Sequence, residues 1–157
     1  MKDKLLIMFF LLASTVSVTL HGQSNTKSIT QPVIIPSNVD ANLTQKESAF
    51  LLEVFNDKLD QYILNSPNRL RAMKHLLRNR IEVKFIQNIT GMKYENLNDV
   101  PMFTAYNTSL ERDTLYNEDT FNALKYDLPF FGAKGKHIYR INNTNHFLII
   151  KPLAHKK

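Results

Sequence analysis

The sequence lacks cysteine and tryptophan altogether, and it contains only four glycines. Without cysteine the chain has no disulfide, no thiolate zinc site, no iron–sulfur cluster and no cysteine nucleophile. The few glycines form no glycine-rich phosphate loop, and neither a Gly-x-Ser-x-Gly nor a His-Glu-x-x-His motif occurs. The motifs therefore predict no cofactor, no metal site and no catalytic residue.

What is present is typical of a folded protein. The 157 residues are 43% hydrophobic and 22% charged, which is enough apolar material for one ordinary core and argues against a disordered chain. Lysine and arginine outnumber aspartate and glutamate by 20 to 14, which gives a formal net charge of +6 at pH 7. A single basic domain is therefore the expectation.

The beginning of the chain has the three parts of a secretory signal peptide. Lys2 and Lys4 supply the positive start, residues 5–13 form an unbroken apolar run, and mostly small or hydroxylated residues follow. The run is shorter than the about 20 apolar residues that span a membrane. We expect residues 1–22 to be removed on export, and the absence of cysteine argues against a lipoprotein. The expected location is periplasmic or secreted, with no stable membrane anchor.

A lead-in segment precedes the predicted domain. Residues 23–43 contain two prolines, several polar residues and no sustained period, which is typical of an extended or partly disordered segment. The apolar periodicity begins after it, so we place a single α+β domain at residues 44–157.

Two helices are expected at the start of this domain. Thr44 and Glu47 have the spacing of a capping box, and the helical apolar period behind them predicts a helix over 45–65. A serine followed by Pro67 suits the beginning of a second helix, which would extend to about residue 79. Because the break between the two helices is short, we expect an antiparallel helical hairpin.

The period then changes from that of a helix to that of strands. Apolar and charged residues alternate over 81–85, which predicts a half-buried strand. Near the C-terminus, segments 138–141 and 146–150 flank an asparagine-rich turn, which predicts a β-hairpin whose second strand is central. The predicted fold class is α+β, with an N-terminal antiparallel helical hairpin packed on a small antiparallel sheet that ends in a C-terminal β-hairpin.

Between these elements, residues 90–135 show no clear period. They contain two similar pieces, at 100–103 and 128–131, in which an apolar residue, a proline and then an aromatic residue occur in the same order. The likeness is too short to indicate a duplicated unit. The sequence alone assigns no structure to this region.

Charges along the two predicted helices suggest a register. Acidic residues of the first helix and basic residues of the second are placed symmetrically about the predicted turn. An antiparallel hairpin would join them in ion pairs that set the register more than the stability, since each exposed pair contributes only about 0–1 kcal/mol. The expected pairs are Glu53 with Arg78, Asp57 with Lys74 and Asp60 with Arg71.

Two further charged groups are candidate functional sites. Residues 128–157 carry bases and no acid, which would suit an anionic glycan or lipid. The candidate anion-binding residues are Lys134, Lys136, Arg140 and Lys151. An upstream loop gathers carboxylates that could serve an envelope hydrolase, although an ordinary solvated loop is the simpler interpretation. The residues of this acidic cluster are Glu111, Asp113, Glu118 and Asp119.

Two histidines lie at the ends of the predicted C-terminal hairpin. His137 and His146 could approach one another across the strands as a metal-binding pair. Since zinc sites in proteins need at least a third ligand and the sequence offers no obvious one, we expect no metal here.

Several stretches of the predicted domain resemble a group of known sequences. These stretches are 94–101, 121–126 and 139–145, together with Asn107, Leu110, Arg112 and Asp113. They resemble small, uncharacterised proteins that carry a signal peptide and are common in flavobacteria and related Bacteroidota. The resemblance covers about residues 45–152 and implies export but no activity. The chain departs from that pattern at Ala123, Asn142, Asn145 and His146.

The leading hypothesis is an exported, soluble, non-enzymatic module that acts by binding or interaction. Its expected partner is an envelope protein or an anionic glycan, and nucleic acid is not expected. The alternatives are a carboxylate-dependent envelope hydrolase and a binder of anionic glycan or lipid through the basic face.

Overall fold

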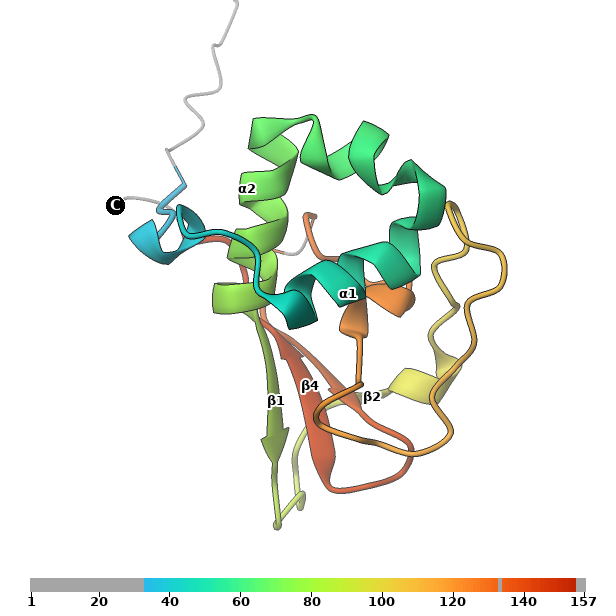
Figure 1. The fold of residues 1–157 in the computed structure, drawn as a ribbon. Coiled ribbons are helices and arrows are strands. Elements are labelled where there is room, and N and C mark those ends of the chain that lie inside the picture. Colours follow the sequence, from blue (N-terminus) through green and yellow to red (C-terminus); the bar gives the residue numbers. More distant parts are fainter. Residues whose placement is uncertain (1–32, 133, 155–157) are drawn as a thin grey trace, which may run out of the picture. The chain divides into compact units, whose positions relative to one another are not determined.

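The computed structural model describes residues 33–132 and 134–154. Two α-helices and a four-stranded sheet lie in this part of the chain, which confirms the predicted α+β class (Figure 1). The predicted signal peptide lies outside the described residues, and so does the lead-in up to residue 32. Within the described ranges, no helix is both long and apolar enough to cross a membrane.

Helix α1 (Gln45–Phe55) begins at the predicted capping box. The Thr44 hydroxyl accepts a hydrogen bond from the Glu47 backbone N–H at 3.1 Å, and the Glu47 carboxylate accepts one from the Thr44 N–H at 2.8 Å. Each side chain thus satisfies a backbone donor that the first turn of a helix leaves without a partner.

The first helix is shorter than predicted, and the helical hairpin does not form. Helix α1 ends because Asn56 has a φ of +47°, which lies outside the helical region. A 3₁₀ turn (Asn56–Lys58) and a π-helical turn (Asp60–Leu64) lead to α2 (Pro67–His75), which a second π-helical turn (Leu76–Arg80) prolongs. Figure 1 shows that α1 and α2 run in clearly different directions instead of lying antiparallel.

The ion-pair register predicted for the helices is wrong, because it required two straight helices on either side of one turn. None of its three pairs occurs among the described residues. Arg78 instead binds Glu47, with nitrogen–oxygen distances of 2.6 and 2.7 Å, and Arg71 lies 3.4 Å from Asp40. The pairs that do not form are Glu53 with Arg78, Asp57 with Lys74 and Asp60 with Arg71.

The described end of the lead-in packs against α2. Its 3₁₀ turn (Ser37–Val39) buries the side chain of its last residue. Arg78 donates a hydrogen bond to the Asn42 carbonyl at 2.7 Å, and Lys74 donates one to the Ala41 carbonyl at 2.8 Å. Basic side chains that the sequence assigned to a helical hairpin therefore hold this segment in place.

The sheet has the strand order β1-β4-β3-β2. Strands β1 (Ile81–Phe85), β3 (His137–Arg140) and β4 (His146–Ile150) pair antiparallel, and β4 is central, as predicted. The short β2 (Glu95–Asn96) pairs in parallel with β3, so the prediction of a purely antiparallel sheet is wrong. The physical reason is that the irregular chain between β1 and β3 returns along the outer edge of β3.

Two groups of buried side chains form the interior. The sheet core consists of Leu97, Val100, Phe121, Ala123, Tyr126, Leu128, Tyr139, Ile141, Leu148 and Ile150. The helix core consists of Leu51, Val54, Phe55, Ile63, Met73, Leu76 and Leu124. The two cores meet at a 3₁₀ turn (Ala123–Lys125), which sends successive side chains into different cores.

Candidate functional site

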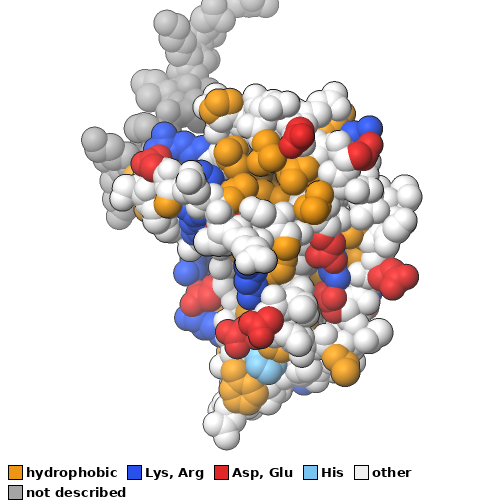
Figure 2. Space-filling view, viewed as in Figure 1, with side chains coloured by type: hydrophobic (Ala, Val, Ile, Leu, Met, Phe, Trp, Pro, Cys, Tyr) orange, Lys and Arg blue, Asp and Glu red, His pale blue; other side chains and the backbone are white. Residues whose placement is uncertain are grey.

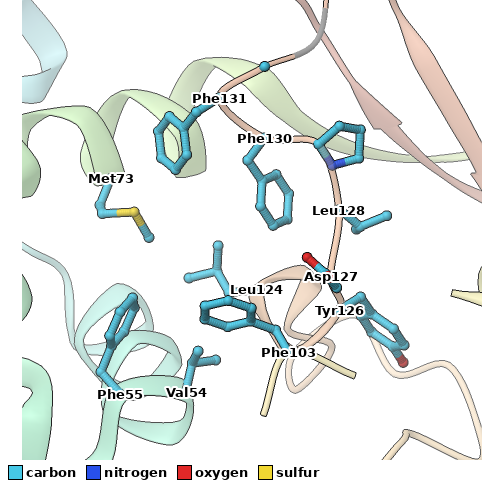
Figure 3. Close-up of a pocket in the computed structure, with 12 residues that line it drawn as sticks. Val54, Phe55, Met73, Phe103, Leu124, Tyr126, Asp127, Leu128, Phe130 and Phe131 are labelled. Carbon is cyan, nitrogen blue, oxygen red and sulfur yellow. The ribbon is translucent and has the colours of Figure 1, made fainter. Parts of the chain in front are cut away.

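An apolar pocket opens beside the helix core. Its walls come from α1, α2, the turn Ala123–Lys125 and the segment 126–132 (Figure 3). The pocket has a volume of about 280 Å³, and among the described residues that line it only Asp127 carries a charge. Its aromatic and sulfur-containing lining residues are Phe55, Met73, Phe103, Tyr126, Phe130 and Phe131.

The two apolar–proline–aromatic pieces of the sequence both contribute to the lining of this pocket, and the first pairs with residues 125–127, directly before the second. The Phe103 N–H donates to the Lys125 carbonyl at 2.7 Å, and the Asp127 N–H donates to the Pro101 carbonyl at 2.9 Å. An antiparallel bridge joins the residues between these contacts. The pieces therefore supply aromatic side chains from two segments that lie far apart in the sequence, and no local pattern predicts this pairing.

Tight turns present the phenylalanines of the second piece. Around Pro129, the Leu128 N–H donates to the Tyr126 carbonyl at 2.9 Å, and the Phe130 N–H donates to the Leu128 carbonyl at 2.7 Å. Such bonds between residues two apart mark γ-type turns. Figure 3 shows Phe130 and Phe131 on the pocket side, with Phe131 at the rim, where it is 56% exposed.

A second hollow of about 460 Å³ adjoins the pocket and shares part of its lining. The shared residues are Phe55, Met73, Phe103 and Phe131. The far wall is an aromatic group in which the Tyr106 ring lies 4.6 Å from Tyr62 and 5.0 Å from Phe55, centroid to centroid. We call the pocket and the hollow together the apolar groove. Figure 2 shows hydrophobic side chains gathered on this face, in the area framed by α1 and α2.

A polar group lies beside the turn that separates the two cores. Lys125 is only 4% exposed, and its Nζ lies 2.6 Å from Oδ1 of Asp113 and 3.4 Å from Oε1 of Glu53. The fully buried Asn122 donates to Oε2 of Glu53 and to the Phe50 carbonyl, both at 2.9 Å. We call Lys125, Asp113, Glu53 and Asn122 the Lys125 cluster.

Arg112 and Tyr126 flank this cluster. Arg112 donates to the carbonyl oxygens of Leu97 at 2.7 Å and Val100 at 2.6 Å, and its guanidinium lies 5.2 Å from the centre of the Tyr126 ring. Burial, and then the charge of Asp113, raise the pKa of Tyr126 to about 12. Figure 3 shows the Tyr126 hydroxyl pointing away from the pocket. That hydroxyl and Oδ2 of Asp113 are buried without a hydrogen-bond partner among the described residues.

Only one member of the predicted acidic cluster takes part in this arrangement. Asp113 binds Lys125, whereas Glu111, Glu118 and Asp119 are exposed. The second carboxylate near Asp113 is Glu53 of α1, and the sequence did not single it out because the helical charge pattern assigned it to an ion pair. Lys125 itself carried no signal, since nothing in a sequence marks a lysine as buried.

The four candidate anion-binding residues do not gather in one place. Lys136 and Lys151 adjoin the register partners His137 and Ile150, whereas Arg140 is at the other end of β3. Lys151 pairs with Glu82 at 3.1 Å, and Arg140 donates to carbonyl oxygens of the hairpin turn, so both already have partners. Lys134 and Lys136 are exposed. A basic binding face stays a prediction.

The two histidines at the hairpin do not meet. His137 is in register with Ile150, while His146 is at the opposite end of β4 and stacks on the Tyr116 ring with a centroid distance of 4.2 Å. The approach of the two rings that the sequence left open does not occur. In the part of the chain that the structure describes, no group of three or more His, Asp or Glu side chains is placed to hold a metal ion.

Compared with models of known protein families, with curated proteins and with solved structures, the chain finds no match in any of the three. A function for this chain must therefore be inferred from the geometry of the apolar groove and of the Lys125 cluster.

Proposed function

We propose that this protein is an exported, non-enzymatic binding module whose apolar groove holds the hydrocarbon part of a small amphiphile, such as an acyl chain. The predicted signal peptide and the resemblance to exported proteins of Bacteroidota support a periplasmic or secreted location. The apolar groove supports the binding role, and it is the observation on which the proposal depends.

The size and the lining of the groove favour a slender apolar ligand. Ligand pockets usually have volumes of about 300–1,000 Å³; the hollow of about 460 Å³ falls within that range, and the pocket of about 280 Å³ lies just below it. The walls are almost entirely aliphatic or aromatic, so binding would draw on apolar burial, which contributes about 25 cal/mol per Å². A sugar or a peptide backbone would need convergent hydrogen-bonding groups, which this lining lacks among the described residues.

Each part of the groove has one charged lining residue among the described residues. Asp127 lines the pocket of about 280 Å³. Arg69, which donates to the Tyr62 carbonyl at 3.2 Å, lines the hollow of about 460 Å³. This arrangement suits an amphiphile whose chain lies along the phenylalanines and whose polar end reaches the rim. The charged groups of the Lys125 cluster face one another, which favours a role within the protein over hydrolysis of an external substrate.

Fluorescence titration with dansyl-labelled undecanoic acid tests this proposal. The matched variants are Phe131→Ala at the groove rim and Phe85→Ala on β1, since these side chains are 56% and 63% exposed and should affect stability equally little. We expect saturable binding, weakened about tenfold by Phe131→Ala because a phenyl contact worth about 1.4 kcal/mol is lost, and unchanged by Phe85→Ala.

Two outcomes would contradict the proposal. Absence of saturable binding to the unmodified chain would contradict the proposal that the groove holds an apolar ligand. Equal weakening by both phenylalanine variants would show that the probe adsorbs to exposed aromatic side chains in general and does not occupy the groove.

A further inference from the structure

The Lys125 cluster contains the groups that formation of an amide bond requires. The Lys125 Nζ is 2.6 Å from Oδ1 of Asp113. Since a carboxyl carbon–oxygen bond is about 1.2 Å long, the Asp113 carboxyl carbon lies within about 4 Å of that nitrogen. Glu53 places a second carboxylate oxygen 3.4 Å from the same nitrogen. We propose that Lys125 and Asp113 react to form an intramolecular amide bond, with Glu53 carrying the protons.

Each of the reacting groups is held in place by its surroundings. Asn142 donates to the Asp113 backbone carbonyl at 2.8 Å, and the neighbouring Arg112 is bound to two further carbonyls. Glu53 belongs to α1 and is oriented by the buried Asn122. Groups fixed near the geometry of attack react as if at very high concentration, because little further ordering is needed.

The surroundings also shield the pair from water. The Lys125 side chain is 5% exposed and that of Asp113 is 21% exposed, and one oxygen of Asp113 is buried without a partner among the described residues. The Glu53 side chain is 40% exposed, so that its carboxylate is in contact both with this shielded pair and with solvent.

The reaction is balanced without any added reagent. The deprotonated Nζ of Lys125 attacks the carboxyl carbon of Asp113, so that the Nζ–Cγ bond forms and one Cγ–O bond breaks. Of the three protons on the starting ammonium, one stays on the amide nitrogen. Glu53 transfers the other two to the leaving oxygen, which departs as water, and Glu53 ends as the carboxylate that it was at the start.

The product would tie together the two ends of an irregular segment. Residues 114–124 contain only a short turn of regular structure at their end, and several of their side chains are exposed. A cross-link that closes such a loop restricts the unfolded chain, as a disulfide does in chains that contain cysteine. This one would have the same effect in a sequence that has no cysteine.

Mass spectrometry of the folded full chain tests the inference. After purification at neutral pH, the protein is denatured, weighed and digested with trypsin. We expect a mass lower than that of the sequence by one water. We also expect a tryptic peptide 113–134 that is lighter by one water, because the amide closes residues 113–125 into a ring and blocks cleavage after Lys125. Lys125→Arg should restore the full mass. Lys46→Arg is the matched control, because Lys46 donates to the Glu118 carbonyl and lies over the Phe50 ring, away from Asp113, and it should leave the loss of water unchanged.

A second pair of variants tests the chemistry itself. In Asp113→Asn the leaving group is ammonia, so the variant should be lighter than its own sequence by one ammonia. Most molecules of the Glu53→Gln variant should have the mass of the uncross-linked chain, because a carboxamide cannot accept and transfer the protons. Finding the full sequence mass and normal cleavage after Lys125 in the folded unmodified chain would falsify the inference, and so would a loss of water that persists in Lys125→Arg.

Discussion

The sheet core and the helix core contain similar side chains, but they differ in how completely they are filled. In the sheet core, Ile141, Leu148 and Ile150 are entirely buried. In the helix core, Phe55 and Met73 are buried from solvent on one side and still line the apolar groove on the other. Strands paired in register place their side chains at regular distances, so that a complementary layer can cover them.

The helices follow no such regular plan. The chain turns at Asn56 and again before Pro67, so α1 and α2 diverge, and the space between them is only partly closed by aromatic side chains. The groove thus lies where regular secondary structure is interrupted. In this protein the space that we propose for a ligand lies beside a break in a helix.

The largest expected effect is that of removing a side chain from the sheet core. Leu148→Ala should lower the free energy of unfolding by about 2–5 kcal/mol, because Leu148 is fully buried and the neighbouring strands cannot collapse into the cavity. Leu52→Ala on α1 is the control, since Leu52 is 56% exposed and should change stability by less than about 0.5 kcal/mol. Urea denaturation measures both. Equal losses would show that the sheet core is no more tightly packed than the surface.

Enlarging a side chain should destabilise the sheet core more than the helix core. Leu148→Phe should destabilise the protein by about 1–3 kcal/mol through overpacking. Leu124→Phe should cost less than about 1 kcal/mol, because its extra atoms can extend into the groove that Leu124 lines. The same variant should weaken binding of dansyl-labelled undecanoic acid. A large destabilisation by Leu124→Phe would mean that the groove does not accept additional volume.

The smallest effect concerns the beginning of α1 and depends on pH. The hydrogen bond from Arg78 holds the pKa of Glu47 below its usual 4.5, burial opposes the shift, and the Thr44 backbone adds to it. The folded state therefore binds this proton less readily than the unfolded chain does. The resulting stability is fully present above pH 4.5 and is lost as the pH falls below 4.5 through the lowered pKa.

Glu47→Ala measures this contribution. At pH 7 the variant should be less stable than the unmodified chain by about 1 kcal/mol, the usual size of a helix cap. Because the contact is only partly shielded from solvent, a larger loss is not expected. Thermal unfolding at pH 7 and at pH 3 should show the difference shrinking on acidification. A difference that stays constant between the two pH values would contradict the assignment.

Local signals predicted the elements that depend on neighbouring residues. The Thr44–Glu47 spacing located the beginning of α1, and the alternation over 81–85 matched β1. The C-terminal hairpin was predicted from its turn, in which Asn142 and Asn143 take φ values of +47° and +57°. Asparagine tolerates this left-handed region better than most residues, which is why an asparagine-rich turn is a readable signal.

The missed features depend on residues that are distant in the sequence. Asn56 also adopts a left-handed φ, but a single asparagine inside an apolar helical period gives no warning of a break. The parallel pairing of β2 and the bridge between Met102 and Tyr126 depend on the path of a long irregular segment. Of the predicted site residues, only Asp113 entered a buried cluster, because it alone met a lysine that the turn at 123–125 directs inward.

Short-range sequence patterns were sufficient for the class of the fold, its capped first helix and its C-terminal hairpin, since propensity, capping and turn geometry act over a few residues. Tertiary packing alone selected the side chains that line the groove and the carboxylates that surround Lys125. Those arrangements arise when segments about ten to seventy residues apart pack together, and the free energy that selects such contacts depends on burial and on partners that no local pattern encodes.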